Sequence, residues 1–390
     1  MDDNLREFCT DRQLEILLAY DEHKTTRKTA KALGTHHSVV ARVIQAVNKK
    51  AAQKGYAPDS DLTRAAPEGF NLDGFSDMRT NPEGKPVWLK YNRDKQQQEE
   101  AFQAALEAFK DEILPRPPTA KPVNTFDHLL TVYPLGDHHL GMLAWAAETG
   151  ETDYDLKRGE ELLTGAMSYL VDTAPDARQA AILILGDFMH YDGMMPVTPT
   201  HGHLLDADSR FPKMVRSAIK SIQYMVRAAL TKHEHVRLVI EIGNHDLSSA
   251  IFLMECFHTL YQDEPRITVD NSPRNIHAFT FGKNLIVTTH GDKLKPAQIP
   301  EIVAHDYYKE WGQTIHRVCH TGHRHHDEIK DYVGMTVETH RILPPADAHS
   351  ALSGYRSRKS MKSISYHAEF GEVARYNFNP AMLGAAEENG

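Results

Sequence analysis

Five short apolar segments between Phe126 and about Phe378 each end in a small group of polar residues and glycine. The segments read LLTVYPLGD, AAILILGD, VRLVIEIGNHD, NLIVTTHGD and HRVCHTGH. Amphipathic stretches of helical spacing lie between them, and this alternation of strand and helix predicts an α/β fold with a layered, mixed sheet. Because the loops that follow strands converge on one edge of such a sheet, we expect the five polar groups to meet in one crevice.

Most polar residues at these strand ends have side chains that bind metals. The groups are Asp137-His138-His139-Leu140-Gly141, Gly186-Asp187-Phe188-Met189-His190, Gly243-Asn244-His245-Asp246, His290-Gly291-Asp292 and Gly322-His323-Arg324-His325. Any one of them alone is usually a turn or an ordinary histidine. As a set, they supply carboxylates, imidazoles and an amide oxygen without a thiolate, which suits a pair of manganese, iron or zinc ions.

In this order the groups resemble the calcineurin-like metallophosphoesterase superfamily, whose pattern is D-x-H, G-D, G-N-H-D/E, H and G-H-x-H. The resemblance covers about residues 130–330 and implies a layered sandwich of two mixed β-sheets flanked by helices. It also implies two divalent metal ions as cofactors, with Mn²⁺ expected and Fe²⁺ or Zn²⁺ as alternatives. It assigns Asp137, His139 and His325 to the first metal, Asn244, His290 and His323 to the second, and Asp187 as a bridge.

The same resemblance implies catalytic roles for residues beside the ligands. His245 matches the histidine next to the scissile phosphate, where it protonates the leaving oxygen or stabilises phosphoryl charge, and Asp246 is expected to orient it. Protein phosphatases of the superfamily continue the second motif as G-D-x-x-D-R-G, which this chain lacks. D-x-H-L-G, G-D-x-x-H and G-N-H-D look instead like the nuclease branch, the SbcD-like DNA repair exonucleases, in which His190 matches a histidine near the metals.

The resemblance to that nuclease branch ends at about Tyr332. Neither its DNA-capping domain nor its docking helices for a coiled-coil ATPase are recognisable in the residues that follow. An ATPase partner is therefore not indicated.

Residues 10–53 have helical apolar spacing with short breaks, which predicts three helices. Ala30, Gly34, Val40 and Val43 have the spacing of a helix-turn-helix DNA-binding motif, in which the alanine lets two helices touch and the glycine provides a left-handed turn. On this interpretation, the residues that face DNA bases or phosphates are Lys28, Lys31, Thr35, His37, Ser38 and Arg42. A three-helix module that binds protein or only packs is the alternative.

The charge of the chain is unevenly distributed. Eight basic residues and no acidic residue lie between Lys24 and Pro58. Residues 1–57 carry a net charge of +3, whereas the whole chain carries −9 and the remainder therefore −12. This asymmetry favours a small basic domain that meets a polyanion.

Composition along the chain predicts four regions. They are a helix-turn-helix domain (1–55), a hairpin, helix and Pro-rich linker (56–122), a metallophosphoesterase domain (123–380) and a flexible tail (381–390). The hairpin is predicted from SDMRT and KPVWLKY, which flank a turn sequence at residues 81–84. A helix near Asp94 to Leu114 is expected to end at the prolines of PRPPTAKP.

A basic segment near the end of the chain, SGYRSRKSMKS, has a composition suited to gripping a phosphate or stacking a base. Its candidate substrate-binding residues are Tyr355, Arg356, Arg358 and Lys359. An ordinary solvated basic loop is the alternative.

These features predict a two-metal phosphodiesterase that hydrolyses DNA, as an exonuclease or endonuclease, and that is brought to DNA by its helix-turn-helix domain. A homodimer on two half-sites is left open. We expect a cytoplasmic protein without a membrane partner, because no apolar run is long enough to span a bilayer and the start MDDNLREFC lacks the pattern of a signal peptide. One alternative is a phosphodiesterase of cyclic or signalling nucleotides, and another is a non-catalytic DNA-binding regulator.

Overall fold

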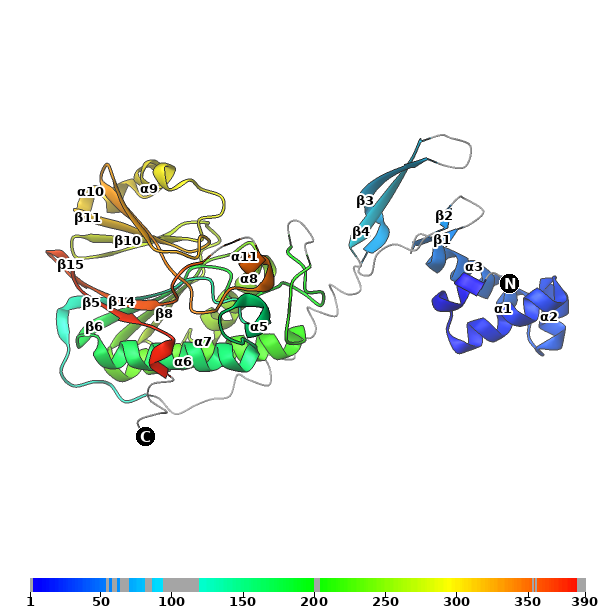
Figure 1. Cartoon of the computed structure of the whole chain (residues 1–390), viewed down its shortest axis with the longest axis horizontal. Helices are drawn as coiled ribbons and strands as arrows, with labels where there is room; N and C mark the ends of the chain where they lie inside the picture. Colours follow the sequence, from blue (N-terminus) through cyan, green and yellow to red (C-terminus); the bar gives the residue numbers. More distant parts are fainter. Residues whose placement is uncertain are drawn as a thin grey trace. The chain divides into compact units, whose positions relative to one another are not determined.

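The computed structural model describes residues 3–53, 56–57, 62–63, 70–80, 86–93, 119–199, 204–352, 354 and 356–383 of the 390-residue chain. The chain divides into two compact units, Met1–Glu100 and Ala101–Gly390 (Figure 1). Among the described helices, none combines the length and the apolar character that crossing a membrane requires.

The first unit contains the three predicted helices, α1 (Asp11–His23), α2 (Thr26–Ala32) and α3 (His37–Gln53), after a short 3₁₀ helix, η1 (Asp3–Phe8). The Thr10 hydroxyl and the Gln13 side chain cap the first turn of α1 reciprocally. Ala30 and Val40 are buried in one apolar cluster, and Gly34, between α2 and α3, has a φ of 62°. The small residue, the turn glycine and the apolar contact of α3 thus occupy the positions that the sequence spacing predicted.

Four strands follow the helices in this unit. β1 (Tyr56–Ala57) pairs with β2 (Leu62–Thr63), and β3 (Phe70–Thr80) pairs with β4 (Pro86–Arg93), both antiparallel. The register of β3 and β4, which brings Thr80 opposite Pro86, confirms the predicted hairpin. The predicted helix near Asp94 to Leu114 lies outside the described residues, as does most of the proline-rich segment.

The second unit contains two mixed β-sheets, as predicted. The six-stranded sheet has the order β15-β14-β5-β6-β7-β8, in which β5 to β8 run parallel and β14 and β15 pair antiparallel. Its strands are β5 (Phe126–Leu135), β6 (Ala177–Ile184), β7 (His235–Ile240), β8 (Ile267–Asp270), β14 (Met361–His367) and β15 (Gly371–Phe378).

The five-stranded sheet has the order β12-β13-β11-β10-β9, with parallel pairs at its centre and antiparallel pairs at both edges. Its strands are β9 (His277–Phe281), β10 (Asn284–Thr289), β11 (His316–Thr321), β12 (Glu328–Tyr332) and β13 (Met335–Thr339).

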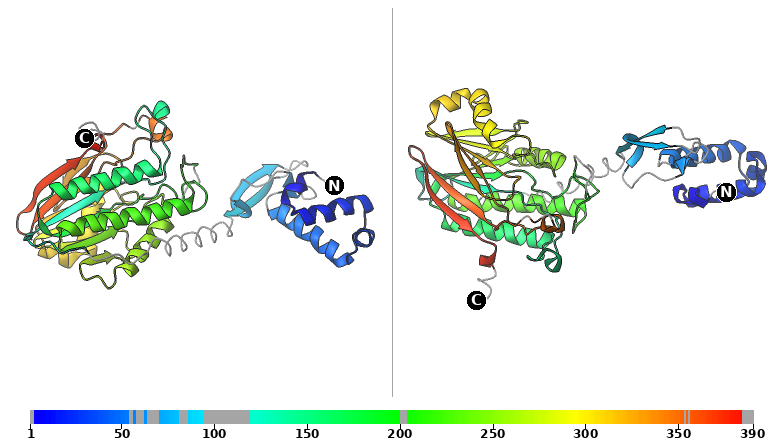
Figure 2. Two further views of the ribbon diagram at one scale, coloured as in Figure 1. Left: turned by 90° about the horizontal axis from the view of Figure 1, so that it is seen from below. Right: turned by 45° about the horizontal axis from the view of Figure 1, so that its top comes forward.

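Helices cover the outer face of each sheet, which gives four layers (Figure 2). Side chains alternate along the strands, so that in β6 Ile182 and Ile184 pack under the helices while Leu183 packs between the sheets. The helices against the six-stranded sheet include α6 (Leu156–Thr173), α7 (Phe211–Lys232) and α8 (Leu247–Leu260), and α9 (Ile299–Asp306) and α10 (Tyr308–Gln313) cover the other sheet. Two short helices, α5 (Ala146–Thr149) and α11 (Ala348–Leu352), contact each other.

The last described residues correct one sequence expectation. Leu383, which was assigned to a flexible tail, packs against the core of the second unit. Gly165 on α6 makes this possible, since a Cβ at that position would lie 2.5 Å from the Leu383 side chain. Residues 384–390 of the predicted tail lie outside the described residues.

Candidate metal centre

The five predicted motifs meet where the carboxyl ends of strands from both sheets adjoin. Asp137 follows β5, Asp187 follows β6 and Asn244 follows β7, all in the six-stranded sheet. His290 follows β10, and the 322–325 turn with His323 and His325 follows β11, in the five-stranded sheet. The structure therefore brings all seven candidate ligands together, although they are spread over about half of the chain.

One group of candidate ligands consists of Asp137, His139 and His325, whose donor atoms lie within 4.8 Å of one another. His325 Nε2 is 2.8 Å from Asp137 Oδ2 and 3.4 Å from His139 Nε2. Two imidazole nitrogens and a carboxylate oxygen that converge in this way match the mixed N/O ligand set of a divalent transition metal. Burial acts to raise the pKa of Asp137, but the His325 and His290 charges hold it well below its usual range.

A second group is centred on His290. Its Nδ1 donates a hydrogen bond to the Leu185 carbonyl at 2.8 Å, which leaves Nε2 facing Asn244 Oδ1 at 3.0 Å and Asp187 Oδ2 at 3.3 Å. Fixing one ring nitrogen on a carbonyl is how proteins aim the other nitrogen at a metal. Asp137 and the exposed His323 belong to the same group. The ligand atoms of Asp137, Asp187, His290 and His323 all lie within 4.8 Å of one another. Burial lowers the pKa of His290, but the neighbouring carboxylates of Asp187 and Asp137 raise it to about 10.

The backbone at the centre is held in an uncommon conformation. Five described residues other than glycine have a positive φ, and four of them are candidate ligands. They are His139 (45°), Asp187 (47°), His323 (65°) and His325 (58°). Left-handed backbone at non-glycine residues is costly and concentrates at functional sites.

Two motif glycines are required by close approach. A Cβ at Gly243 would lie 2.0 Å from Asp187 Oδ1, and a Cβ at Gly322 would lie 2.4 Å from Asp137 Oδ1. Each glycine therefore lets the backbone of one motif approach the carboxylate of another. This explains why glycine opens both the G-N-H-D and the G-H-x-H motifs.

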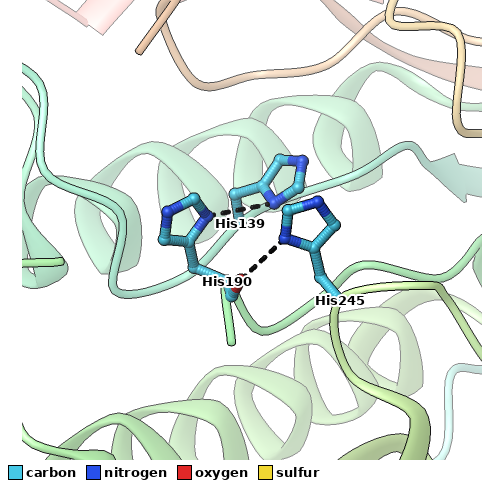
Figure 3. A group of neighbouring side chains, drawn as sticks. All are labelled: His139, His190 and His245. Carbon is cyan, nitrogen blue, oxygen red and sulfur yellow. Dashed lines mark hydrogen bonds between the residues drawn. The ribbon is translucent and has the colours of Figure 1, made fainter. Parts of the chain in front are cut away.

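His245 lies beside the ligands, and its imidazole is held differently from the sequence expectation. Its Nδ1 donates to the backbone carbonyl of His190 at 2.8 Å (Figure 3). Asp246 instead accepts hydrogen bonds from the backbone amides of Gly243 and Met189, both at 3.1 Å. The expectation that Asp246 orients His245 is therefore wrong: a carbonyl holds the ring, and the buried carboxylate joins the two loops.

His190 lies next to His139, with their Nδ1 atoms 3.3 Å apart (Figure 3). It is buried, and burial lowers its pKa to about 3, so the ring is neutral. A neutral His190 Nδ1 can accept a hydrogen bond from His139 Nδ1. His139 Nε2 is then left for a metal. Its Nε2 is buried and has no partner among the described residues.

A cleft of about 1060 Å³ opens over the centre and is lined by His139, His190, His245, His323 and His325. Of the basic residues predicted to bind substrate, Arg356 and Lys359 line this cleft, whereas the exposed Arg358 does not. Tyr355 lies outside the described residues. Neighbouring Ser357 donates to the His325 carbonyl at 2.6 Å, which ties this segment to the metal centre.

Three further basic residues line the cleft and were missed by the sequence analysis: Lys293, Lys295 and Arg324. Arg324 is paired with Glu328 at 3.1 Å and Lys293 with Asp292 at 2.6 Å. The sequence feature that could have identified them is their position within or just after the metal-binding motifs. Lys293 and Lys295 lie in HGDKLK, and Arg324 lies in GHRH.

In the first unit, the predicted DNA-contacting residues lie on and around α2 and α3. Lys28, Lys31, His37 and Arg42 are exposed, and Thr35 and Ser38 are half-buried. The Ser38 hydroxyl lies 2.8 Å from His36 Nδ1, and Arg42 Nε donates to the Ser38 carbonyl at 3.3 Å. The charged residues of this set are therefore accessible to a ligand.

Searches with the sequence found no matching family model and no matching curated protein. The fold is similar to that of an archaeal phosphodiesterase, at 12% identity and a TM-score of 0.33, over 64% of this chain and 99% of that one. It is also similar to a predicted phosphoesterase from Streptococcus pneumoniae (10%, TM-score 0.28, 64% and 97% covered). A third similar structure is vacuolar protein sorting 29 from Cryptosporidium parvum (11%, TM-score 0.31, 65% and 100% covered). Structural similarities at this level do not indicate a function. The functional conclusions below therefore depend on the site itself.

Proposed function

We propose that this chain is a two-metal phosphodiesterase that hydrolyses DNA. The observation that carries the proposal is the convergence of seven N and O ligands into two overlapping groups beside His245. The ligand assignment follows the resemblance: Asp137, His139 and His325 for one ion, Asn244, His290 and His323 for the other, with Asp187 between them. Manganese is the expected ion, with iron or zinc as alternatives.

When bound, two such ions supply Lewis-acid polarisation of the phosphoryl oxygens and lower the pKa of an attacking water. The residues of the chain have separate tasks. His245 is half-buried and lines the cleft, and because its Nδ1 is held by the His190 carbonyl, its Nε2 is the nitrogen that can give a proton to the leaving oxygen. Asp187 Oδ1 accepts a hydrogen bond from the His245 amide at 2.7 Å, so the same carboxylate group positions the proton donor.

DNA is proposed as the substrate because basic residues occur in both units. Lys293, Lys295, Arg324, Arg356 and Lys359 line the cleft, where they suit the phosphates that flank a scissile bond. The exposed Lys28, Lys31 and Arg42 support a DNA-binding role for the helix-turn-helix spacing. Signalling nucleotides are a second candidate, since the cleft volume of about 1060 Å³ is in the range of small-ligand sites.

The experiment compares end-labelled linear DNA, closed-circular DNA and a panel of cyclic nucleotides, with Mn²⁺ and with chelator. We expect metal-dependent cleavage of DNA, and the comparison of linear with circular DNA separates exonuclease from endonuclease action. Intact DNA together with a cleaved small phosphodiester would replace the nuclease by a nucleotide phosphodiesterase.

Asp187→Asn is the variant that tests the metal centre. We expect it to abolish phosphodiester hydrolysis, because it weakens the binding of both ions at once while Asn keeps an oxygen for the His245 amide. Turnover and metal content are measured together in the wild type and the variant. Turnover retained by Asp187→Asn would refute the bridging assignment.

A further inference from the structure

A second cavity adjoins the metal cleft on the side of His290. It has a volume of about 690 Å³, and His290 and Gly243 belong to its wall. Asp292, Lys293 and Leu294 line both this cavity and the metal cleft. The two spaces are therefore neighbours that share one loop, and a group attached to a phosphate at the metal centre has this cavity within reach.

The lining of the second cavity combines an apolar patch with polar and charged side chains. The apolar patch comprises Ile242, Leu247, Ile276, Leu294 and Ile302, which come from the loop after β7, α8, the loop before β9, the shared loop and α9. Polar side chains, among them Arg274, Asn275 and His305, lie at exposed positions of the lining. A cavity of this size with an apolar patch beside polar groups suits an organic group better than a bare phosphate.

One buried carboxylate distinguishes this cavity. Glu241 lines it and is 2% exposed. Glu241 Oε1 accepts hydrogen bonds from His277 Nδ1, at 2.8 Å, and from the Thr288 hydroxyl. Among the described residues, none donates to Oε2, so one oxygen of a fixed carboxylate remains available to a ligand.

The partner His277 holds this carboxylate in place. His277 Nε2 lies 3.0 Å from the Ser272 carbonyl, so both ring nitrogens face oxygen acceptors. Only the doubly protonated imidazolium donates from both nitrogens. Glu241 and His277 therefore form a buried ion pair with fixed geometry, and the free oxygen accepts from a neutral N–H donor.

We propose that this cavity is a nucleobase subsite, in which Glu241 accepts a hydrogen bond from the exocyclic amino group of cytosine, adenine or guanine. A carboxylate that accepts from the cytosine amino group is an established mode of base recognition. The inference rests on the proposed phosphodiesterase function, because a phosphate at the metal centre would anchor the nucleotide. It adds a preference for nucleoside-bearing phosphates that the metal ligands cannot provide.

The test measures equilibrium binding to the Mn²⁺-loaded full chain by calorimetry, with deoxycytidine 5′-monophosphate, thymidine 5′-monophosphate and methyl phosphate as probes. We expect the deoxycytidine nucleotide to bind at least about tenfold more tightly than methyl phosphate, given the usual strength of a specific base contact. Ile302→Trp and Leu294→Trp, which fill the cavity from two of its lining elements, should each remove this advantage. Ile315→Trp, at an exposed position outside the cavity lining, is the matched control and should retain it.

Glu241→Gln tests the hydrogen bond itself. It should remove the preference for deoxycytidine over thymidine, since thymine has no exocyclic amino group and an amide at this position no longer offers a fixed carboxylate. Equal binding of the deoxycytidine nucleotide and methyl phosphate would overturn the subsite, as would an advantage that survives both tryptophan substitutions in the cavity.

Hydrolysis of bis-p-nitrophenyl phosphate is followed on the same samples and separates the two proposals. Hydrolysis without any nucleoside preference overturns the subsite alone. Nucleoside-dependent binding without hydrolysis of any phosphodiester supports the subsite and overturns the proposed enzymatic function.

Discussion

His245 and Asp246 are neighbours in sequence, yet their side chains stabilise different parts of the centre. His245 contacts the His190 carbonyl with one ring nitrogen, whereas both oxygens of Asp246 accept from backbone amides. Burial and the Asp187 charge raise the pKa of Asp246 to about 8. Asp246 therefore joins the two loops through backbone hydrogen bonds, and His245 remains the proposed proton donor.

His245→Asn is expected to keep about two metal ions per chain and to lower the hydrolysis rate by about 10²–10⁴-fold, the usual contribution of a general acid. The reason is that the proposed ligand assignment does not include His245, although its ring nitrogens also converge with those of His139 and His190. Metal analysis and turnover on the same preparation provide the measurement. A parallel loss of metal would show that His245 is itself a ligand.

The Glu241–His277 pair predicts a pH dependence of stability. Burial lowers the pKa of His277, but the hydrogen bond and charge of Glu241 raise it from 6.5 to about 9. Because the folded pKa is above the unfolded one, this stabilisation is fully present below pH 6.5 and is lost as the pH rises through about 9. It amounts to at most about 3 kcal/mol.

This pH dependence is measured as the free energy of unfolding between pH 6 and 10, in the wild type and in His277→Gln. We expect the difference in stability between the two proteins to shrink across this range. A difference that stays constant with pH would mean that His277 is not protonated in the fold.

At the level of elements, a buried charge network joins the two sheets. Lys362 on β14 lies 3.0 Å from Glu338 Oε1 on β13 and 2.7 Å from Asp327 Oδ1, just before β12. Arg375 on β15 makes a bidentate contact with Glu338. His320, Glu338 and His340 lie close enough together to form a candidate metal-binding group. Both Glu338 oxygens are already paired with the side chains of Lys362 and Arg375, so we interpret this cluster as structural.

Lys362→Met is expected to destabilise the fold by about 3 kcal/mol, because it leaves buried carboxylates with fewer cationic partners. Lys362→Arg should recover part of this loss. Chemical denaturation measures both, with Lys330→Met, at an exposed position of β12, as the control that should cost less than about 1 kcal/mol. Equal stability of Lys362→Met and Lys330→Met would show that the network contributes little.

At the level of the whole molecule, the candidate DNA-contacting residues and the candidate metal centre belong to different units. The exposed Lys28, Lys31 and Arg42 belong to the first unit, and the candidate metal centre belongs entirely to the second. DNA binding and phosphodiester hydrolysis should therefore be separable by truncation.

Deletion of residues 1–55 is expected to weaken DNA binding and to flatten its dependence on salt concentration, because fewer counterions are released from DNA. Hydrolysis of bis-p-nitrophenyl phosphate should be unchanged, since every candidate ligand remains. Fluorescence anisotropy at several salt concentrations gives the affinity and its slope. An unchanged affinity for DNA would refute the proposed DNA-binding role of the first unit.

The sequence by itself determined the alternation of strands and helices, the three helices and the hairpin, and the resemblance of its motifs to a known superfamily added the two-sheet architecture and the candidate ligands. These features depend on local patterns: apolar periodicity, turn residues, and motifs such as G-N-H-D that keep their order along the chain. Only the tertiary structure decided that His190 provides a carbonyl for His245, that Lys293 and Arg324 line the same cleft as Arg356, and that Glu241 lies in a cavity beside His290. Such contacts join residues far apart in sequence, and they depend on the packing of two sheets and on hydrogen-bond directions that no local pattern contains.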